Sequence, residues 1–261
     1  MTRATRLSPD RYLQLLAADG TRLADVSVDR LDEPAPTCPG WDVAEVVRHT
    51  GSVYNHKIAC IDIGRRPEEG EWESRPPQGT DLVDWYRGTL TAILQRLGSL
   101  DATTPAYTWY APEQDVAFWQ RRMAQEAVVH RVDAEAAAGQ VTPVDDDLAV
   151  DGIDEVLDIF LRYGFSATDV AADPDLDVTR HAGRSVLVRT GPHAWHLAVA
   201  SGEPEQVVLT REARPAQATA SAEPSELLLW LWGRRPDSAV TITGDPAAAA
   251  ALRDLLVLAT Q

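Results

Sequence analysis

The sequence predicts a two-domain α+β protein: an all-α, up-and-down four-helix bundle followed by a small α+β domain. Apolar residues recur at helical spacing through four long segments, all before residue 139. Beyond about residue 163 the pattern changes to short alternating runs with turn residues between them, which is typical of strands. The stretch GQVTPVDDD, residues 139–147, interrupts both patterns. We therefore predict domains at 1–145 and 146–261.

The four helices of the first domain are each marked by an apolar face, and the first also has Pro9 in a position suited to a first turn. The connections between them are rich in turn residues: EPAPTCPGW holds three prolines, and GRRPEEGEWESRPPQG is long and polar. The predicted helices cover about 8–30, 43–61, 81–97 and 115–138.

The second domain begins with a helix over about 148–163. Two further helices follow later in the chain, at 223–235 and 245–259, and the last has Asp245 as its N-cap and Pro246 at its first position. Between and around these helices, short runs in which apolar and polar residues alternate indicate strands. The predicted strands cover 184–190, 193–201, 205–213, 217–221 and 239–244.

Composition and charge exclude several classes of protein. The 261 residues are 44% hydrophobic and 25% charged, as expected of a globular chain, and carry a net charge of −16. Such a field repels phosphate, so nucleic acid and anionic membranes are not expected partners. The chain has two cysteines, no signal-like apolar run and no stretch near the roughly 18 apolar residues of a membrane span. We therefore expect a cytoplasmic protein.

The fourth predicted helix carries ionisable groups on its apolar side. At helical spacing, Glu126, His130 and Asp133 share one face with Trp119 and Met123. Carboxylates are rarely buried without a partner. Residues four apart present two ligands to one point, and a third ligand from a neighbouring helix would complete a metal site.

His49, at the edge of the apolar face of the second helix, is the candidate third ligand. Two histidines and one glutamate suit zinc in a catalytic arrangement that leaves one position open. Asp133 would then orient a ligand histidine or pair with an arginine.

A buried salt bridge is the competing explanation for Glu126. Its partner could be any of four arginines: Arg48, Arg121, Arg122 or Arg131. His56 is open to a role as a fourth ligand or substrate contact, although a solvated or capping role is favoured. Cys38 is interpreted as structural and Cys60 as packed within the second helix.

Four stretches together resemble the mycothiol-dependent maleylpyruvate isomerase family: CPGWDVAEVVRHTGSVYNHK, FWQRRMAQEAVVHRVDAEAAAG, LAVDGIDEVL and LLLWLWGRR. The resemblance implies a DinB-like metal-binding bundle joined to a sterol-carrier-like domain. It places the metal ligands, usually of zinc, on His49, Glu126 and His130. It also implies an active arginine in the second domain, Arg234 or its neighbour Arg235. Many relatives have histidine where this chain has Gln125.

The resemblance implies a metal-dependent enzyme that activates mycothiol as a zinc thiolate for addition to an electrophile. The outcome would be cis–trans isomerisation or thiol transfer, with Arg234 or Arg235 stabilising negative charge on the substrate. The alternative is a non-catalytic, metal-stabilised module that binds a small ligand. The expected partners are a small electrophile and a low-molecular-weight thiol. The oligomeric state stays open, with a monomer allowed.

Overall fold

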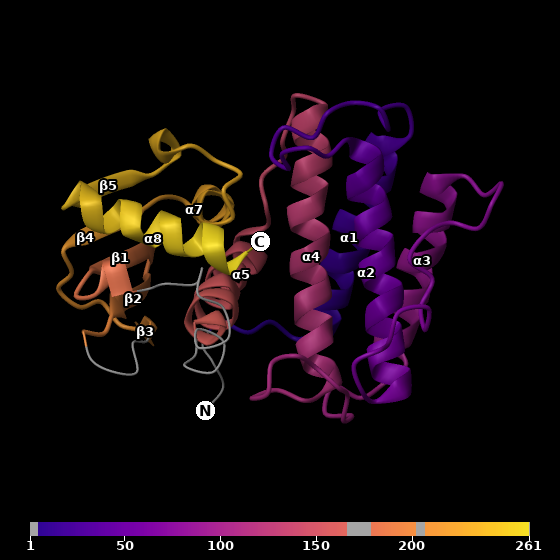
Figure 1. Ribbon diagram of the computed structural model, residues 1–261, viewed down its shortest axis with the longest axis horizontal. Helices are drawn as coiled ribbons and strands as arrows, with labels where there is room; N and C mark the ends of the chain where they lie inside the picture. Colours follow the sequence, from indigo (N-terminus) through magenta and orange to yellow (C-terminus); the bar gives the residue numbers. More distant parts are fainter. Residues whose placement is uncertain (1–4, 166–178, 202–206, 261) are drawn as a thin grey trace. The chain divides into compact units, whose positions relative to one another are not determined.

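The computed structural model describes residues 5–165, 179–201 and 207–260 (Figure 1). The chain divides into two compact units, one of residues 7–142 and one of residues 143–261 together with the first six. The first unit is helical and the second combines a sheet with helices, which confirms the predicted fold class. The predicted domain limits, 1–145 and 146–261, remain a prediction.

The first unit is a bundle of four helices, and three of them begin at an aspartate N-cap. The side chains of Asp42, Asp81 and Asp115 each accept hydrogen bonds from backbone N–H groups of the following turn, which would otherwise lack partners. The first helix ends three residues before its predicted limit. The helices are α1 (Pro9–Ser27), α2 (Val43–Ile63), α3 (Leu82–Gly98) and α4 (Val116–Ala137).

Each helix packs mainly against two others, and consecutive helices are not always neighbours. α4 lies beside α1 and α2, and α3 lies beside the same two helices, whereas α1 and α2 make little contact (Figure 1). The connections 28–42 and 99–115 therefore join helices that make little contact with each other. Each is tied to the cap of the next helix by an isolated bridge, Pro34 with Asp42 and Pro105 with Asp115. The α2–α4 contact brings the predicted metal ligands together.

α4 differs from the predicted single apolar stripe, because nearly all of its described side chains are buried. Its buried charges are compensated by ion pairs. Arg131 lies 2.9 Å from Asp19 and 2.7 Å from Glu135, and Arg22 lies 2.9 Å from Glu135. Removing one partner of such a pair would leave an uncompensated buried charge, which is strongly destabilising.

The second unit opens with α5 (Asp146–Glu155), which continues as a π-helical segment, η1 (Val156–Tyr163). The apolar pattern predicts a helix over this region but does not distinguish the two hydrogen-bonding patterns. Asp154 and Asp158 are buried here, and both pair with Arg211. Two more helices and two short 3₁₀ turns follow: α7 (Pro224–Leu231), α8 (Pro246–Ala259), η2 (Thr179–His181) and η3 (Asp237–Ala239).

The described strands form one five-stranded sheet in the order β3-β2-β1-β4-β5, in which only β1 and β4 are parallel neighbours. Val186 pairs with Leu197 and Val188 with Trp195, and all four side chains are buried. Each predicted strand is found, at shorter length. The first two residues of the third predicted strand, Glu205 and Gln206, lie outside the described residues. The strands are β1 (Ser185–Thr190), β2 (His193–Val199), β3 (Val207–Thr210), β4 (Ala218–Ser221) and β5 (Thr241–Gly244).

Candidate metal centre

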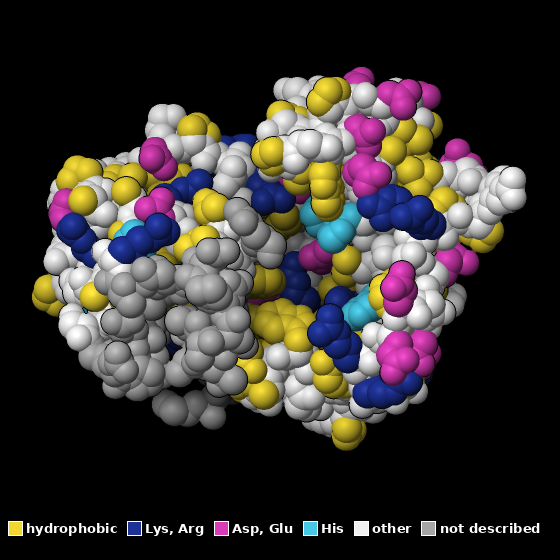
Figure 2. Space-filling model, viewed as in Figure 1, with side chains coloured by type: hydrophobic (Ala, Val, Ile, Leu, Met, Phe, Trp, Pro, Cys, Tyr) yellow, Lys and Arg dark blue, Asp and Glu magenta, His cyan; other side chains and the backbone are white. Residues whose placement is uncertain are grey.

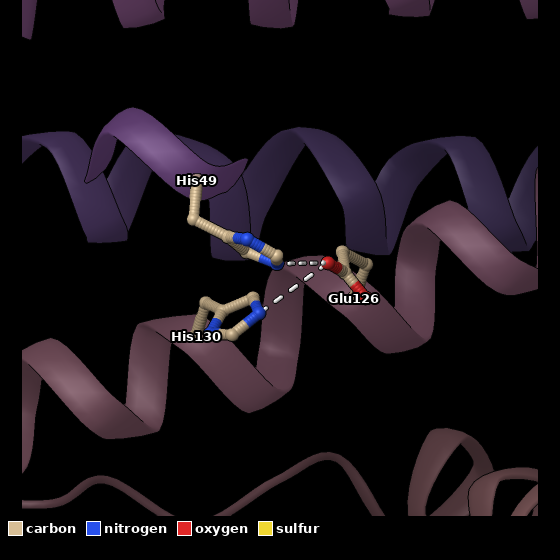
Figure 3. Close-up of side chains that lie close together, drawn as sticks. All are labelled: His49, Glu126 and His130. Atoms are coloured by element: carbon tan, nitrogen blue, oxygen red, sulfur yellow. Dashed lines mark ion pairs between the residues drawn. The ribbon is translucent and has the colours of Figure 1, made fainter. Parts of the chain in front are cut away.

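Three predicted ligands meet between α2 and α4. His49 comes from the second turn of α2, whose start is fixed by the Asp42 cap, and Glu126 and His130 lie one turn apart on α4. Figure 3 shows the two imidazole rings converging on the glutamate carboxylate. One nitrogen or oxygen atom from each residue lies within 4.8 Å of the other two. The helix-to-helix contact thus joins residues 77 to 81 positions apart in the sequence.

The separations suit a small divalent cation. Nε2 of His49 and Nε2 of His130 each lie 3.3 Å from Oε1 of Glu126. A tetrahedral zinc with bonds of roughly 2.0–2.1 Å holds its ligand atoms roughly 3.3–3.4 Å apart. Three protein ligands of this type leave one position for a fourth, non-protein ligand, which is the pattern of catalytic rather than structural zinc. The donor set therefore fits the group that the sequence predicts.

Asp133 fixes the orientation of His130, as one of its two predicted roles requires. Oδ2 of Asp133 lies 3.0 Å from Nδ1 of His130, and the Thr37 hydroxyl donates to Oδ1 at 2.6 Å. Asp133 is fully buried. Once a metal has displaced the second proton of the ring, a carboxylate on Nδ1 leaves the Nε2 lone pair directed at the cluster, and it raises the basicity of the ligand nitrogen.

Glu126 is also held by an arginine, as in the competing salt-bridge explanation. Nη2 of Arg122 donates to Oε2 of Glu126 at 2.6 Å, and Arg122 is buried. The two histidines, however, approach the other oxygen, Oε1. The ion pair and the three-ligand cluster therefore coexist, because each uses a different oxygen of one carboxylate.

Trp41 restrains both histidine rings. Its ring centroid lies 5.0 Å from that of His49 and 6.5 Å from that of His130, in a stacked arrangement with the latter. The two imidazoles lie edge to face at 5.0 Å. Such aromatic contacts limit ring rotation and keep the ligand nitrogens in place.

Glu126 and His130 strongly shift each other's pKa. Burial alone would raise the pKa of Glu126, but the charge on His130, hydrogen bonds from both histidines and Arg122 hold that pKa well below its usual range. Burial alone would lower the pKa of His130, but Glu126 and Asp133 raise it to about 9. Without a cation, His130 is therefore protonated at neutral pH, and a metal must displace that proton.

The cluster is accessible from one side. The side chain of His49 is 37% exposed, whereas those of Glu126 and His130 are 13% and 10% exposed. Figure 2 shows histidine side chains at the surface of the helical unit beside acidic and basic ones. A small molecule can therefore approach the ligand atoms from the His49 side without unfolding the bundle.

Other candidates from the sequence do not join the cluster. The His56 ring packs against Trp72 with centroids 4.7 Å apart, and its Nδ1 lies 3.6 Å from Sγ of Cys60. It is neither a fourth ligand nor a helix cap. Cys60 is buried in α2, as predicted, and Gln125 is buried outside the ligand set.

The two candidate arginines belong to the second unit. The Arg234 guanidinium donates to the backbone carbonyl of Trp232 at 2.7 Å, and Arg235 pairs with Glu226 at 2.8 Å. A role for Arg234 at the cluster stays a prediction.

The sequence argument did not single out Arg122 among four candidate arginines, and it missed the contacts of Trp41 and Thr37. Arg122 is one of the four arginines that the sequence offers as a partner of Glu126, and its spacing of four from Glu126 favours it over the others. Trp41 and Thr37 lie in the connection before α2, where no periodicity reports which side chains fold back onto the helices.

Comparison with known proteins points to one family. A family model described as the mycothiol maleylpyruvate isomerase N-terminal domain matches residues 12–135, and the model of the corresponding C-terminal domain matches residues 147–251. A search of curated proteins found no match. Among the described residues, no helix combines the length and hydrophobicity needed to cross a bilayer.

Solved structures share the fold. The crystal structure of the mycothiol-dependent maleylpyruvate isomerase matches 94% of this chain and 97% of its own, with a TM-score of 0.60 and 12% identity. A mutant of that enzyme with alanine in place of a histidine matches over the same shares, with a TM-score of 0.58 and 12% identity. At this identity the likeness concerns the fold. Because the two family models together span most of the chain, this protein belongs to the mycothiol maleylpyruvate isomerase family.

Proposed function

We propose that the protein is a metal-dependent isomerase that uses mycothiol to convert a cis enedioate-type substrate, such as maleylpyruvate, to its trans isomer. The observation that carries the proposal is the convergence of His49, Glu126 and His130 at distances that suit a three-ligand catalytic metal. Family membership and the named activity of the structurally similar enzyme support the same reaction class.

His49, Glu126 and His130 would hold the cation, with zinc as the metal that the donor set favours. Bound zinc lowers the pKa of a coordinated thiol so far that the thiolate forms near neutral pH. Asp133 keeps His130 in the tautomer that offers Nε2, and Arg122 holds the second oxygen of Glu126 away from the cluster.

The reaction is balanced without an external oxidant or reductant. The thiolate sulfur adds to one carbon of the double bond, and the electron pair moves to the conjugated carbonyl oxygen as an enolate. Rotation about the new single bond, followed by loss of the thiolate, restores the double bond in the trans geometry. Fixed positive charge near the enolate and carboxylates lowers the barrier.

Arg234 is proposed to supply part of that charge, by resemblance to the family. Arg234→Ala is expected to leave metal content unchanged and to reduce thiol-dependent turnover by about 10²-fold or more. Arg235→Ala is the matched control, since Arg235 already pairs with Glu226. Equal loss in both variants, or no loss in Arg234→Ala, would remove Arg234 from the mechanism.

A non-catalytic binding module receives less support. The apolar cavity between the sheet and α8 has about 20 Å³ of accessible space, lined by residues such as Val186, Leu197 and Leu252. That volume holds about one water molecule. Among the described residues of the second unit, this cavity offers no room for a stored apolar ligand.

The deciding experiment is turnover of maleylpyruvate by the zinc-loaded protein with and without mycothiol. We expect conversion to the trans isomer only with mycothiol present, and loss of activity in His130→Ala. A stable thioether product would instead establish thiol transfer with the same nucleophile. Failure of the loaded protein to consume maleylpyruvate or mycothiol would overturn the proposal for this substrate.

A further inference from the structure

Lys57 is the only lysine among the 24 lysine and arginine residues of the chain. It lies on α2 eight residues after His49, a rise of about 12 Å along the helix axis. Side chains of a helix lean toward its N-terminus, so the long lysine side chain leads back toward the His49 end. Arginine and lysine are not equivalent, because lysine presents a compact charge with three donors that can take any direction.

The ammonium group of Lys57 lies between α2 and α4, the two helices that carry the metal ligands. Nζ is 5.2 Å from the ring centroid of Trp119, which is fully buried on α4 seven residues before Glu126. Nζ is also 3.0 Å from Nδ1 of His56. Lys57 and Trp119 are eight and seven residues from His49 and Glu126 on their respective helices, so they meet on one side of the cluster along the α2–α4 contact, about 10–12 Å from it along the helix axes.

Lys57 has two neutral partners and lacks a direct counter-charge. No carboxylate oxygen of a described residue lies within 4.0 Å of its Nζ. Burial, with help from the Lys57 charge, lowers the pKa of His56 to about 4, so His56 is neutral and its Nδ1 accepts a hydrogen bond from the Lys57 ammonium. Arg122 and Arg131, in the same bundle, each pair with a glutamate. A half-buried cation without a paired anion is ready to bind one.

We propose that Lys57 binds a carboxylate of the substrate, orienting an anionic electrophile along the α2–α4 contact toward the metal centre. This assignment rests on the proposed function, since it takes the electrophile to be a carboxylate. One lysine donor remains with His56, and the Trp119 face excludes water on one side, which strengthens the attraction between ammonium and carboxylate.

The kinetic test compares Lys57→Met with Arg87→Met, which removes one charge from an exposed face of α3. With maleylpyruvate and mycothiol, we expect Lys57→Met to raise KM roughly 10- to 100-fold, with metal content and Tm close to those of the wild type. For the neutral dimethyl ester of maleate as thiol acceptor, KM should change less than twofold. Equal losses for charged and neutral acceptors, or no change for either, would overturn the assignment. Arg87→Met should leave KM unchanged for both the charged and the neutral acceptor.

A second test does not depend on turnover. Protein labelled with ¹³C at the lysine ε-carbon gives one lysine signal, because the chain has one lysine. Titration with maleate should shift that signal to saturation in the metal-free and the zinc-loaded protein, whereas dimethyl maleate should not. A signal that does not move with maleate would refute the role of Lys57. If the signal shifts but maleylpyruvate is not consumed, the anion site stands and the proposed reaction fails.

Discussion

At Glu126 the two carboxylate oxygens have different partners. Oε2 accepts from Arg122 at 2.6 Å, while both histidine Nε2 atoms lie 3.3 Å from Oε1. The arginine offsets the charge of the carboxylate and fixes its rotation. A cation at the cluster would then replace the histidine–glutamate contacts without breaking the arginine pair.

Asp133 acts through His130 and should control metal affinity. Asp133→Asn keeps the size of the side chain but removes the charge that stabilises the ligand imidazole. We expect metal affinity to fall about 10- to 100-fold. Competition with a chromophoric chelator measures the change.

Asp19→Asn is the matched control for that measurement, since Asp19 pairs with Arg131 rather than with a ligand. It should lower stability while leaving metal affinity within about twofold. Equal affinities for Asp133→Asn and the wild type would show that Asp133 does not orient the ligand.

Metal uptake should release a proton from His130. Burial opposes protonation of this ring, but Glu126 and Asp133 raise its pKa to about 9, above the usual value of 6.5. Below pH 9 the metal competes with that proton, so apparent affinity should rise with pH up to about 9 and then level off. Calorimetry in buffers of different ionisation enthalpy should detect about one proton released at pH 7. An affinity that does not change between pH 6 and 8 would contradict the ion-pair arrangement.

At the scale of single residues, the sequence predicts a contact where the spacing of two residues along a helix fixes their relative positions. The i, i+4 pair Glu126–His130 and its extension to Asp133 could be predicted from one helical face. Trp41 and Thr37 could not, because they lie in a connection whose path depends on tertiary contacts. The spacing of four residues predicts the ion pair between Arg122 and Glu126, but the neighbouring Arg121 was also a candidate partner from the sequence.

At the scale of elements, α2 is positioned by close contact with α3. A Cβ atom added to Gly51 would lie 2.5 Å from the Trp85 ring, a buried side chain. His49 is two residues earlier on the same helix. The glycine therefore lets α2 approach α3, and this approach sets where the histidine meets α4.

Gly51→Ala should destabilise the bundle by roughly 1–3 kcal/mol, since the extra methyl group overpacks the interface. Gly88→Ala on α3 is the matched control: it is exposed and has nothing within 4 Å of an added Cβ. That change should stabilise by about 0.5–1 kcal/mol, through helix propensity. Urea unfolding measures both, and a stabilising Gly51→Ala would show that α2 and α3 are not held this closely.

Periodicity and capping residues predicted where the helices and strands occur, with limits a few residues from those observed. They did not predict which helices are neighbours. α1 and α2 make little contact, and the 28–42 connection is long enough to pass to the far side of the bundle. Periodicity also missed the π-helical segment Val156–Tyr163, since an apolar face is compatible with either type of turn.

For the whole molecule, a net charge of −16 opposes the approach of a dicarboxylate. The metal centre reverses that field locally. Arg122 and Lys57 lie near Glu126, and a bound divalent cation would add two further positive charges. Under the proposed function, these short-range charges would attract an anionic substrate. Added salt screens both this attraction and the long-range repulsion, so substrate binding should change only modestly with ionic strength.

The composition and patterning of the chain were sufficient to predict two domains of different class, because the period of the apolar residues changes between them. Function required more, since fold and charge are shared by proteins with many activities. The resemblance of four stretches to a known family supplied the expected reaction class, and the spacing of Glu126 and His130 indicated a metal site. Under our proposal the choice of electrophile depends on isolated side chains such as Lys57, whose role no periodic pattern predicts.

Titration of the metal-free protein with Co²⁺ tests the central claim most directly. We expect visible bands that saturate at one Co²⁺ per chain, lose intensity in His49→Ala and His130→Ala, and gain a sulfur-to-cobalt charge-transfer band when mycothiol is added. Saturation reports the three-ligand site, and the new band reports a position open to sulfur. No saturable binding, or the same spectrum in wild type and both variants, would contradict the account.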